Sequence, residues 1–306
     1  MRVPLRRMIH SVGIGMLVIV MGCSSSKNEI HPYASQEPMN TARSFLPDIV
    51  NTDLIEEMIA FSPDGQTMYF SRLSLEQLRV GLYFSNFKNG QWSAPEKVPF
   101  SIKDRNDLAP FMSSDGKRLF FISDRRTETE STTSRVRRIW YVDKEGNDWG
   151  EPQIAKGIPA GELSISENNN VYVAVFSGNS EYIYKMKWTE DQFEKPVKLS
   201  SAINNPDYLN TIPYIAPDES FLVFGRYTQS PETYEMYVSY NRDGEWSEAE
   251  KLSETINESG YFSYAGTISP DGKYLFFAKG KPWSTRSNID IYQLDLKEAG
   301  IQLATD

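Results

Sequence analysis

The stretch "SPDGKYLFF", residues 269–277, returns in nearly the same form as "SPDGQTMYF" at residues 62–70. Each copy offers a serine that can open a turn, a proline with a preset φ, and a glycine where φ becomes positive. Apolar residues flank the turn on both sides, as strands require. The stretch therefore predicts a β-hairpin, and its return predicts repeated units.

This hairpin phrase occurs five times, with its turn positions about 50 residues apart. The copies are "FSPDGQTMYF" from Phe61, "MSSDGKRLFF" from Met112, "ISENNNVYV" from Ile165, "IAPDESFLVF" from Ile215 and "ISPDGKYLFF" from Ile268. The third copy lacks both proline and glycine, so its turn is the weakest prediction. Self-similarity at this period is typical of repeated supersecondary units.

A second hairpin follows the first in four copies, with turns "KNGQ" at 88–91, "KEGN" at 144–147, "TEDQ" at 189–192 and "RDGEW" at 242–246. Asn-Gly and Asp-Gly are strong hairpin signals. An aromatic residue comes next, and a proline stands three positions later except in the fourth copy, at Trp92 and Pro95, Trp149 and Pro152, Phe193 and Pro196, and Trp246 and Ala249. Since proline favours edge strands, each unit should have four strands, the fourth at an outer edge. The aromatic residue should pack between neighbouring units.

Four-stranded antiparallel units without helices between them predict an all-β protein, a β-propeller. The segment "SFLPDIV", residues 44–50, is similar to the outer strand that the last copy lacks. We expect it to close the ring and give five blades, with six as the alternative. The repeated phrase resembles the WD40-like PD40 repeat of TolB-type propellers over roughly residues 45–295. The resemblance implies a propeller that binds a partner rather than one that catalyses a reaction.

The first residues predict export, because Arg2, Arg6 and Arg7 precede the apolar run "MIHSVGIGMLVIVMG". This makes residues 1–22 a signal peptide. Its end, "VMGC", resembles the lipobox of bacterial lipoproteins, so Cys23 should carry lipid such as palmitate and anchor the chain to a membrane. Residues 23–44 are polar and predict a flexible tether, and residues 45–306 the propeller domain. The serine after Cys23 favours the outer membrane, facing the periplasm or the cell surface.

Composition excludes several classes of function. The net charge of −9 becomes −12 without residues 1–22, which argues against nucleic-acid binding. The two histidines are His10 and His31, so the propeller has none for nucleophilic catalysis or for a zinc site. Cys23 is the single cysteine, so a disulfide within the chain is impossible. We therefore predict no metal and no cofactor.

Residues at the start of the innermost strands are candidates for ligand binding: Glu57, Asp107, Glu162, Thr211 and Tyr264. In a propeller these positions surround one mouth of the central channel, here called the top. The three carboxylates are similar to the acids on successive blades of five-bladed furanosidases, and paired carboxylates are what glycoside hydrolysis needs. A glycoside hydrolase or a carbohydrate-binding propeller is therefore the alternative, and solvated or paired strand ends are the simpler interpretation.

The links between the second and third strands should emerge at the same top face, and they are basic. Their cations are Arg72, Arg79, Arg125, Arg126, Arg135, Arg137, Arg138, Arg226, Lys279, Lys281 and Arg286. A basic rim around an acidic channel mouth would steer an acidic protein or an anionic glycan toward the top. In the alternative, each arginine pairs with a nearby acid such as Asp124, Glu128 or Glu130. The sequence thus predicts a monomeric, membrane-anchored lipoprotein whose non-catalytic propeller binds a protein or cell-envelope partner.

Overall fold

The computed structural model describes residues 32–303, except residues 34, 36, 75, 77, 128, 129, 132, 159, 286 and 287. All of them belong to one compact unit, His31–Asp306. The predicted signal peptide and Cys23 lie outside the described residues. Within these described ranges the long elements are all β-strands, and the helical structure is one 3-10 turn, η1 (Trp283–Thr285). The all-β prediction is confirmed.

Antiparallel β-units follow one another along the chain, one for each copy of the hairpin phrase. The first unit contains β2 (Ile55–Phe61), β3 (Thr67–Ser74), β4 (Arg79–Lys88), β5 (Gln91–Trp92) and β6 (Glu96–Lys97). The second contains β7 (Asp107–Met112), β8 (Arg118–Ser123), β9 (Arg138–Glu145), β10 (Asp148–Trp149) and β11 (Gln153–Ile154). In each of them the expected outer strand is split into two short pieces that both pair with the third strand.

The later units repeat this order. The third contains β12 (Leu163–Ile165), β13 (Asn170–Ser177), β14 (Ser180–Thr189), β15 (Gln192–Phe193) and β16 (Val197–Lys198). The fourth contains β17 (Leu209–Ile215), β18 (Phe221–Gln229), β19 (Glu232–Arg242), β20 (Glu245–Trp246) and β21 (Glu250–Lys251). The last contains β22 (Phe262–Ile268), β23 (Tyr274–Gly280) and β24 (Ile289–Asp295), and β1 (Arg43–Ser44) pairs with its free edge.

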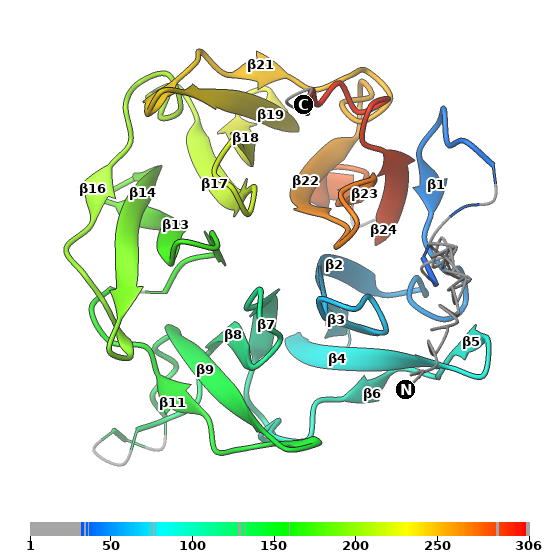
Figure 1. Ribbon diagram of the computed structural model, residues 1–306, viewed down its shortest axis with the longest axis vertical. Helices are drawn as coiled ribbons and strands as arrows, with labels where there is room; N and C mark the ends of the chain where they lie inside the picture. Colours follow the sequence, from blue (N-terminus) through cyan, green and yellow to red (C-terminus); the bar gives the residue numbers. More distant parts are fainter. Residues whose placement is uncertain are drawn as a thin grey trace, which may run out of the picture. The chain divides into compact units, whose positions relative to one another are not determined.

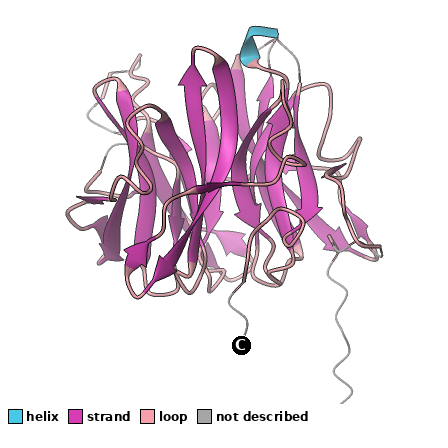
Figure 2. Cartoon of the chain, turned by 90° about the horizontal axis from the view of Figure 1, so that it is seen from above, coloured by secondary structure: helices cyan, strands magenta, loops and turns pink. Residues whose placement is uncertain are grey.

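The innermost strands surround a common centre, as expected for a propeller. Strand β7 contacts β2 and β12, β17 contacts β12 and β22, and β2 contacts β22, which closes the circle (Figure 1). The strands run between two faces, and η1 lies at one of them (Figure 2). Ile55 of β2 also lies parallel to Ile289 of β24, so the first and last units share one nine-stranded sheet. The number of separate blades therefore stays a prediction.

The hairpin phrase forms the turns that its residues predict. The amide of Gly65 donates to the carbonyl of Ser62 at 2.8 Å, and φ of Gly65 is +68°. At the equivalent turn position Gly116 and Gly272 have φ of +69° and +71°. In the copies without glycine, Asn169 and Glu219 adopt the same left-handed conformation. The turn is thus retained in the third copy, where its sequence signal is weakest.

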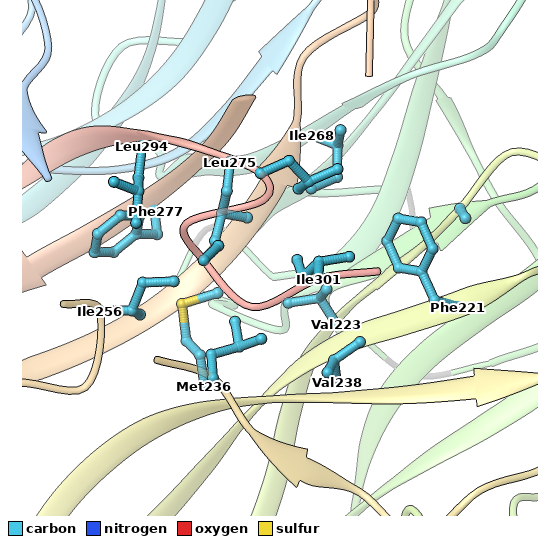
Figure 3. Packing of buried hydrophobic residues seen from close by; sticks show 14 residues of the cluster. Phe221, Val223, Met236, Val238, Ile256, Ile268, Leu275, Phe277, Leu294 and Ile301 are labelled. Atoms are coloured by element: carbon cyan, nitrogen blue, oxygen red, sulfur yellow. The ribbon is translucent and has the colours of Figure 1, made fainter. Parts of the chain in front are cut away.

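Apolar side chains between adjacent units form the core. In one cluster, Val223 and Met236 of the fourth unit pack with Leu275 and Phe277 of the last (Figure 3). The aromatic residue of the second hairpin packs against the preceding unit, as expected: the Trp246 ring lies 5.9 Å from that of Tyr172. Burial of such aromatic surface is the main source of stability in sheet-on-sheet packing.

The segment before β2 completes the last unit, and more of it is folded than the sequence predicted. Its strand β1 pairs with Tyr292 and Gln293 of β24, which confirms that it completes the last unit. The expected tether over residues 23–44 is wrong for its later part, because Tyr33 and Met39 are buried in the same cluster as Phe45. The folded body therefore begins about twelve residues earlier than expected, near Tyr33, because these apolar side chains cover the edge of the last unit. No helix in the described part of the chain has the length and hydrophobicity to cross a membrane.

Candidate functional site

A β-bulge near the start of the inner strand sets which side chains reach the channel. The register shifts after Glu57, Leu108, Thr211 and Tyr264, at the strands of the first, second, fourth and last units. The residue that follows each of them has positive φ, between +45° and +56°. An extra residue of this kind re-aims a side chain. These residues therefore form one layer across successive units.

Glu162 joins this layer without a bulge. Its carbonyl accepts a hydrogen bond from the amide of Ala174 at 3.1 Å, and Ala174 holds the position that Ser71 holds opposite Glu57. The short strand β12 pairs residue by residue with β13. The layer thus contains Glu57, Glu162, Thr211 and Tyr264 of the residues predicted from sequence.

The expectation that Asp107 belongs to this layer is wrong. Asp107 lies opposite Ser123, one position earlier, and its place in the layer is taken by Leu108. Its side chain is fully buried, and it accepts hydrogen bonds from the Arg125 guanidinium at 2.9 Å and from Ser101 Oγ at 3.2 Å.

Arg125 likewise does not belong to an exposed rim. It is 3% exposed and lies over the rings of Phe121 and Trp140, at 4.7 and 5.3 Å from their centroids. Asp107 and Arg125 form a buried ion pair within the second unit.

Two stacked tyrosines hold the Glu57 carboxylate. Tyr264 Oη donates to Glu57 Oε2 at 2.6 Å. The Tyr264 ring is parallel to that of Tyr234 with centroids 4.6 Å apart, and Tyr234 Oη lies 2.5 Å from Thr211 Oγ1. Burial raises the pKa of Glu57, and the bond from Tyr264 opposes this shift. Burial also raises the pKa of both tyrosines well above 10, so they remain neutral hydrogen-bond donors.

A third acid, which sequence reasoning missed, lies beside Glu162. Glu181, at the start of β14, is 5% exposed, and burial together with the charge of Glu162 raises its pKa to about 8. Burial raises the pKa of Glu162 as well, while the charge of Arg137 lowers it. An alignment of the third strands could have found Glu181, because it holds the position of Arg137 in the second unit and Tyr234 in the fourth.

Most of the predicted basic rim is neutralised. Arg138 pairs with Glu130, and Arg135 lies 3.6 Å from a carboxylate oxygen of Asp124, as the pairing alternative predicted. Arg137 differs, because it is exposed and forms no ion pair with any residue that the structure describes. Its charge nevertheless acts on Glu57 and Glu162, so it lies near the mouth of the channel. Arg286 and Glu128 lie outside the described residues.

Several other rim cations are engaged in bonds, whereas Arg126 is exposed and has no ion pair among the described residues. Arg72 pairs with Glu56 at 2.8 Å, and Lys279 pairs with Glu258 at 2.8 Å. Arg226 is buried and donates to the carbonyl of Ile203 at 3.1 Å. Of the two exposed rim arginines without an ion pair in the described ranges, Arg126 and Arg137, Arg137 is the one whose charge acts on the channel glutamates, so it is the better placed to meet a ligand at the mouth.

The channel below the layer offers little space. Its cavity has a volume of about 40 Å³ and is lined by the bulge residues and by Glu162, with Pro110, Pro213 and Gly266 among the others. This is room for about one water molecule. In the described residues, no group of three or more His, Cys, Asp or Glu side chains could hold a metal ion.

Comparisons with known proteins identify the fold. No protein-family model and no curated protein matches the chain. A candidate TolB protein from Agrobacterium tumefaciens matches with a TM-score of 0.50 and 16% identity, over 75% of this chain and 72% of that one. A GH43_12 protein from a capybara gut metagenome matches with a TM-score of 0.53 and 12% identity, over 91% of this chain and 56% of that one.

A third match is the endo-arabinase from Bacteroides thetaiotaomicron VPI-5482, with a TM-score of 0.50 and 15% identity, over 84% of this chain and 95% of that one. This chain spans little more than half the length of the GH43_12 chain. The chain therefore has the β-propeller fold that is found in TolB and in GH43 proteins. At these identities the likeness concerns the fold and does not select an activity.

Proposed function

We propose that the chain is an exported lipoprotein whose non-catalytic propeller binds a protein or another cell-envelope component through its top face. The observation that supports binding over catalysis is the position of Asp107. Glycoside hydrolysis requires carboxyl groups free to meet the sugar, and Asp107 is bound to Arg125 inside the second unit. Leu108 takes its place in the layer, so the expected set of three acids is incomplete.

The groups that remain at the channel mouth suit recognition. Arg137 is exposed and can meet an acidic group of a partner. The stacked tyrosines Tyr234 and Tyr264 are buried, and their hydroxyl groups bond Thr211 and Glu57, so they fix the layer behind the mouth. The charge of Arg137 acts on Glu57 and Glu162, with which it forms no ion pair.

Recovery of a partner tests this proposal. The purified full-length chain should retain a specific protein or glycan from solubilised cell envelope, identified by mass spectrometry. Arg137→Glu should reduce recovery at least fivefold, because it reverses an exposed rim arginine that forms no ion pair with any described residue. Lys187→Glu changes an exposed cation on the third strand of another unit and should have no effect. Equal recovery by the two variants would contradict the top-face assignment.

Glycoside hydrolysis is the second candidate, and Glu57 and Glu162 favour it. Glu57 lies on the inner strand β2 and Glu162 directly before the inner strand β12, in a fold shared with an endo-arabinase, and burial raises the pKa of both, as a general acid requires. Release of sugar from envelope glycans by the full-length chain, lost in Glu57→Gln and in Glu162→Gln, would replace our proposal. Unchanged release in these variants would point to a contaminating activity.

The lipid anchor is proposed at Cys23 from the "VMGC" sequence, with the outer membrane as its site. Cells that express the chain should incorporate an alkyne analogue of palmitate into it. Cys23→Ser should abolish the label and release the protein from the membrane fraction. Label that persists in this variant would rule out a lipoprotein anchored at this residue.

A further inference from the structure

A groove of about 590 Å³ lies beside β4, under the link from β6 to β7. It opens at the end of the first unit where β2 begins, since Leu54 lines it. Its charged lining residues are Arg72, Arg79, Lys97, Lys103, Arg105 and a single acid, Asp104. This concentration of positive charge contrasts with the net charge of −9 for the chain.

Two of these cations lack a carboxylate partner. Arg72 pairs with Glu56, and Arg79 donates to the carbonyl of Asp104 at 2.7 Å and lies 3.8 Å from its carboxylate. Lys97 and Lys103 are exposed and form no ion pair with any residue in the described ranges. The groove therefore has positive charge that the protein itself does not neutralise.

The fourth unit explains why Lys97 has no carboxylate partner. Lys97 lies opposite Tyr83, and Lys251 lies opposite Tyr237 at the equivalent place. Lys251 Nζ donates to a carboxylate oxygen of Glu235 at 2.5 Å. The residue equivalent to Glu235 in the first unit is glycine, so the carboxylate is missing there.

That glycine, Gly81, forms part of the groove wall. A Cβ at this position would lie 3.5 Å from Lys97 Cε and 2.9 Å from the Tyr83 ring. Because glycine has no Cβ, the space beside Lys97 and the Tyr83 ring is not filled by a side chain.

The third unit provides a further comparison. Lys198 lies opposite Tyr184, in the same register as Lys97 and Tyr83. The position of Gly81 is occupied there by Tyr182, and Lys198 Nζ lies 3.0 Å from the centroid of its ring. The lysine of the outer strand thus has a close partner in the third and fourth units, a ring at 3.0 Å or a carboxylate at 2.5 Å. In the first unit Lys97 Nζ lies 6.0 Å from the centroid of the Tyr83 ring and forms no ion pair with any described residue.

We propose that this groove binds a phosphate group, either of a free phosphorylated molecule or of a lipid headgroup. Lys97 and Lys103 would supply point charges, and Arg79 a guanidinium donor at the edge. The volume lies within the range of small-ligand sites and would admit a sugar phosphate. Binding in the groove needs neither the channel acids nor Arg137, so it does not depend on the partner proposed for the channel mouth.

Calorimetry on the purified full-length chain tests the proposal, with inorganic phosphate and glucose 1-phosphate as probes. Both should bind, with affinity that falls as salt rises. Lys97→Glu combined with Lys103→Glu should weaken binding at least tenfold. Gly81→Glu supplies the carboxylate that the fourth unit has and should have a similar effect. Cosedimentation with phosphatidylglycerol vesicles, compared with phosphatidylcholine vesicles, distinguishes a lipid headgroup from a free ligand.

The control is Lys198→Glu, which reverses the equivalent lysine in the third unit and should leave phosphate binding unchanged. Gly81→Glu crowds Tyr83, so Lys97→Met, which adds no bulk, keeps the test valid if the first variant unfolds. If the chain binds the soluble phosphates and the groove variants do not, the ligand is a free phosphorylated molecule. If the chain binds only the anionic vesicles, the ligand is a lipid headgroup. Absence of binding to every probe, or binding that the groove variants do not change, would overturn the proposal.

Discussion

The first and fourth units have the same strands, the same inner-strand bulge and the same turn, yet their grooves carry opposite charge. The groove of the fourth unit, about 420 Å³, is lined by Glu232, Glu235, Glu254, Glu258 and one lysine, Lys251. The first unit has a basic groove at the equivalent place. Buried and turn residues define the repeated unit, whereas its exposed ends are free to diverge. The residues that differ between the repeated units therefore indicate function, whereas the residues that the units share indicate only the fold.

The two units also differ inside. Glu56 lies opposite Arg72 in the first unit, and Asn210 lies opposite Arg226 in the fourth. The Glu56 side chain is fully buried and paired. Arg226 is instead held by a carbonyl and by the Tyr237 ring, 4.5 Å away, and burial lowers its pKa. The same register thus holds an ion pair in one unit and an unpaired cation in the other.

The largest expected effect on stability comes from substituting these two buried arginines. Arg72→Met leaves the Glu56 carboxylate buried without its counterion and should cost about 3–5 kcal/mol of unfolding free energy. Arg226→Met removes a buried cation that has no carboxylate and should cost less than about 1 kcal/mol. Urea unfolding followed by tryptophan fluorescence measures both values. Equal losses would show that the ion pair does not distinguish the units.

The outer strands give the next effect. Phe45 follows β1, is 4% exposed and donates its amide to the carbonyl of Ile291 at 2.9 Å. Phe45→Ala should cost about 3 kcal/mol through lost burial. Glu250→Ala in the exposed outer strand of the fourth unit should change the unfolding free energy by less than about 0.5 kcal/mol. A similar small change for Phe45→Ala would argue against closure by this segment.

The third unit extends the comparison to pH. Glu181 holds the place of Tyr234, and its pKa is raised from 4.5 to about 8. The folded state therefore keeps a proton that the unfolded chain releases, so the stability that Glu181 contributes is greatest below pH 4.5 and is lost as pH rises toward 8. The loss is on the order of a few kcal/mol, at about 1.4 kcal/mol per pKa unit. Glu181→Gln should reduce this slope in urea titrations between pH 5 and pH 8, and the buried Glu57 and Glu162, whose pKa values are also raised, should account for the rest. An unchanged slope would assign it to another group.

The smallest effect concerns the exposed lysines of the two grooves. Lys251→Met breaks a surface ion pair with Glu235 and should cost less than about 1 kcal/mol. Lys97→Met breaks no ion pair and should change stability by less than about 0.5 kcal/mol. Thermal unfolding at low and high salt distinguishes the two variants. Only the loss of stability in Lys251→Met should become smaller as salt rises, because salt screens the ion pair that this variant lacks.

The fold could be predicted because its signals are local. The residues of each hairpin phrase favour the turn by themselves. Even the third copy has Asn169, a residue that tolerates positive φ, at the turn. The closing role of the segment around Ser44 was also predictable from its likeness to an outer strand. The burial of Tyr33 and Met39 was not, because it depends on the edge of a strand 250 residues later in the chain.

The site was only partly predictable because the bulge is invisible in sequence. Glu57 lies four residues before the end of its strand at Phe61, whereas Asp107 lies five residues before Met112. A one-residue difference in register moves a side chain to the opposite face of the sheet. Ala109 adopts the bulge conformation without being a glycine, so nothing in the sequence marks it. Gly81 was missed for another reason. It indicates a site only when it is compared with Glu235 and Tyr182, the residues at the equivalent positions of the fourth and third units.

The pairing of β1 with β24 has a consequence for how the chain folds. Asn51 is bonded to Ile291, 240 positions away, so a segment synthesised at the start must wait for a strand synthesised near the end. Closing so long a loop costs conformational entropy before any contact compensates for it. Until then the last sheet has an unprotected edge that could pair with another chain. A nascent or secreted chain cut short before β24 would therefore present the two surfaces that the complete ring conceals, and aggregation should depend on whether both ends are present.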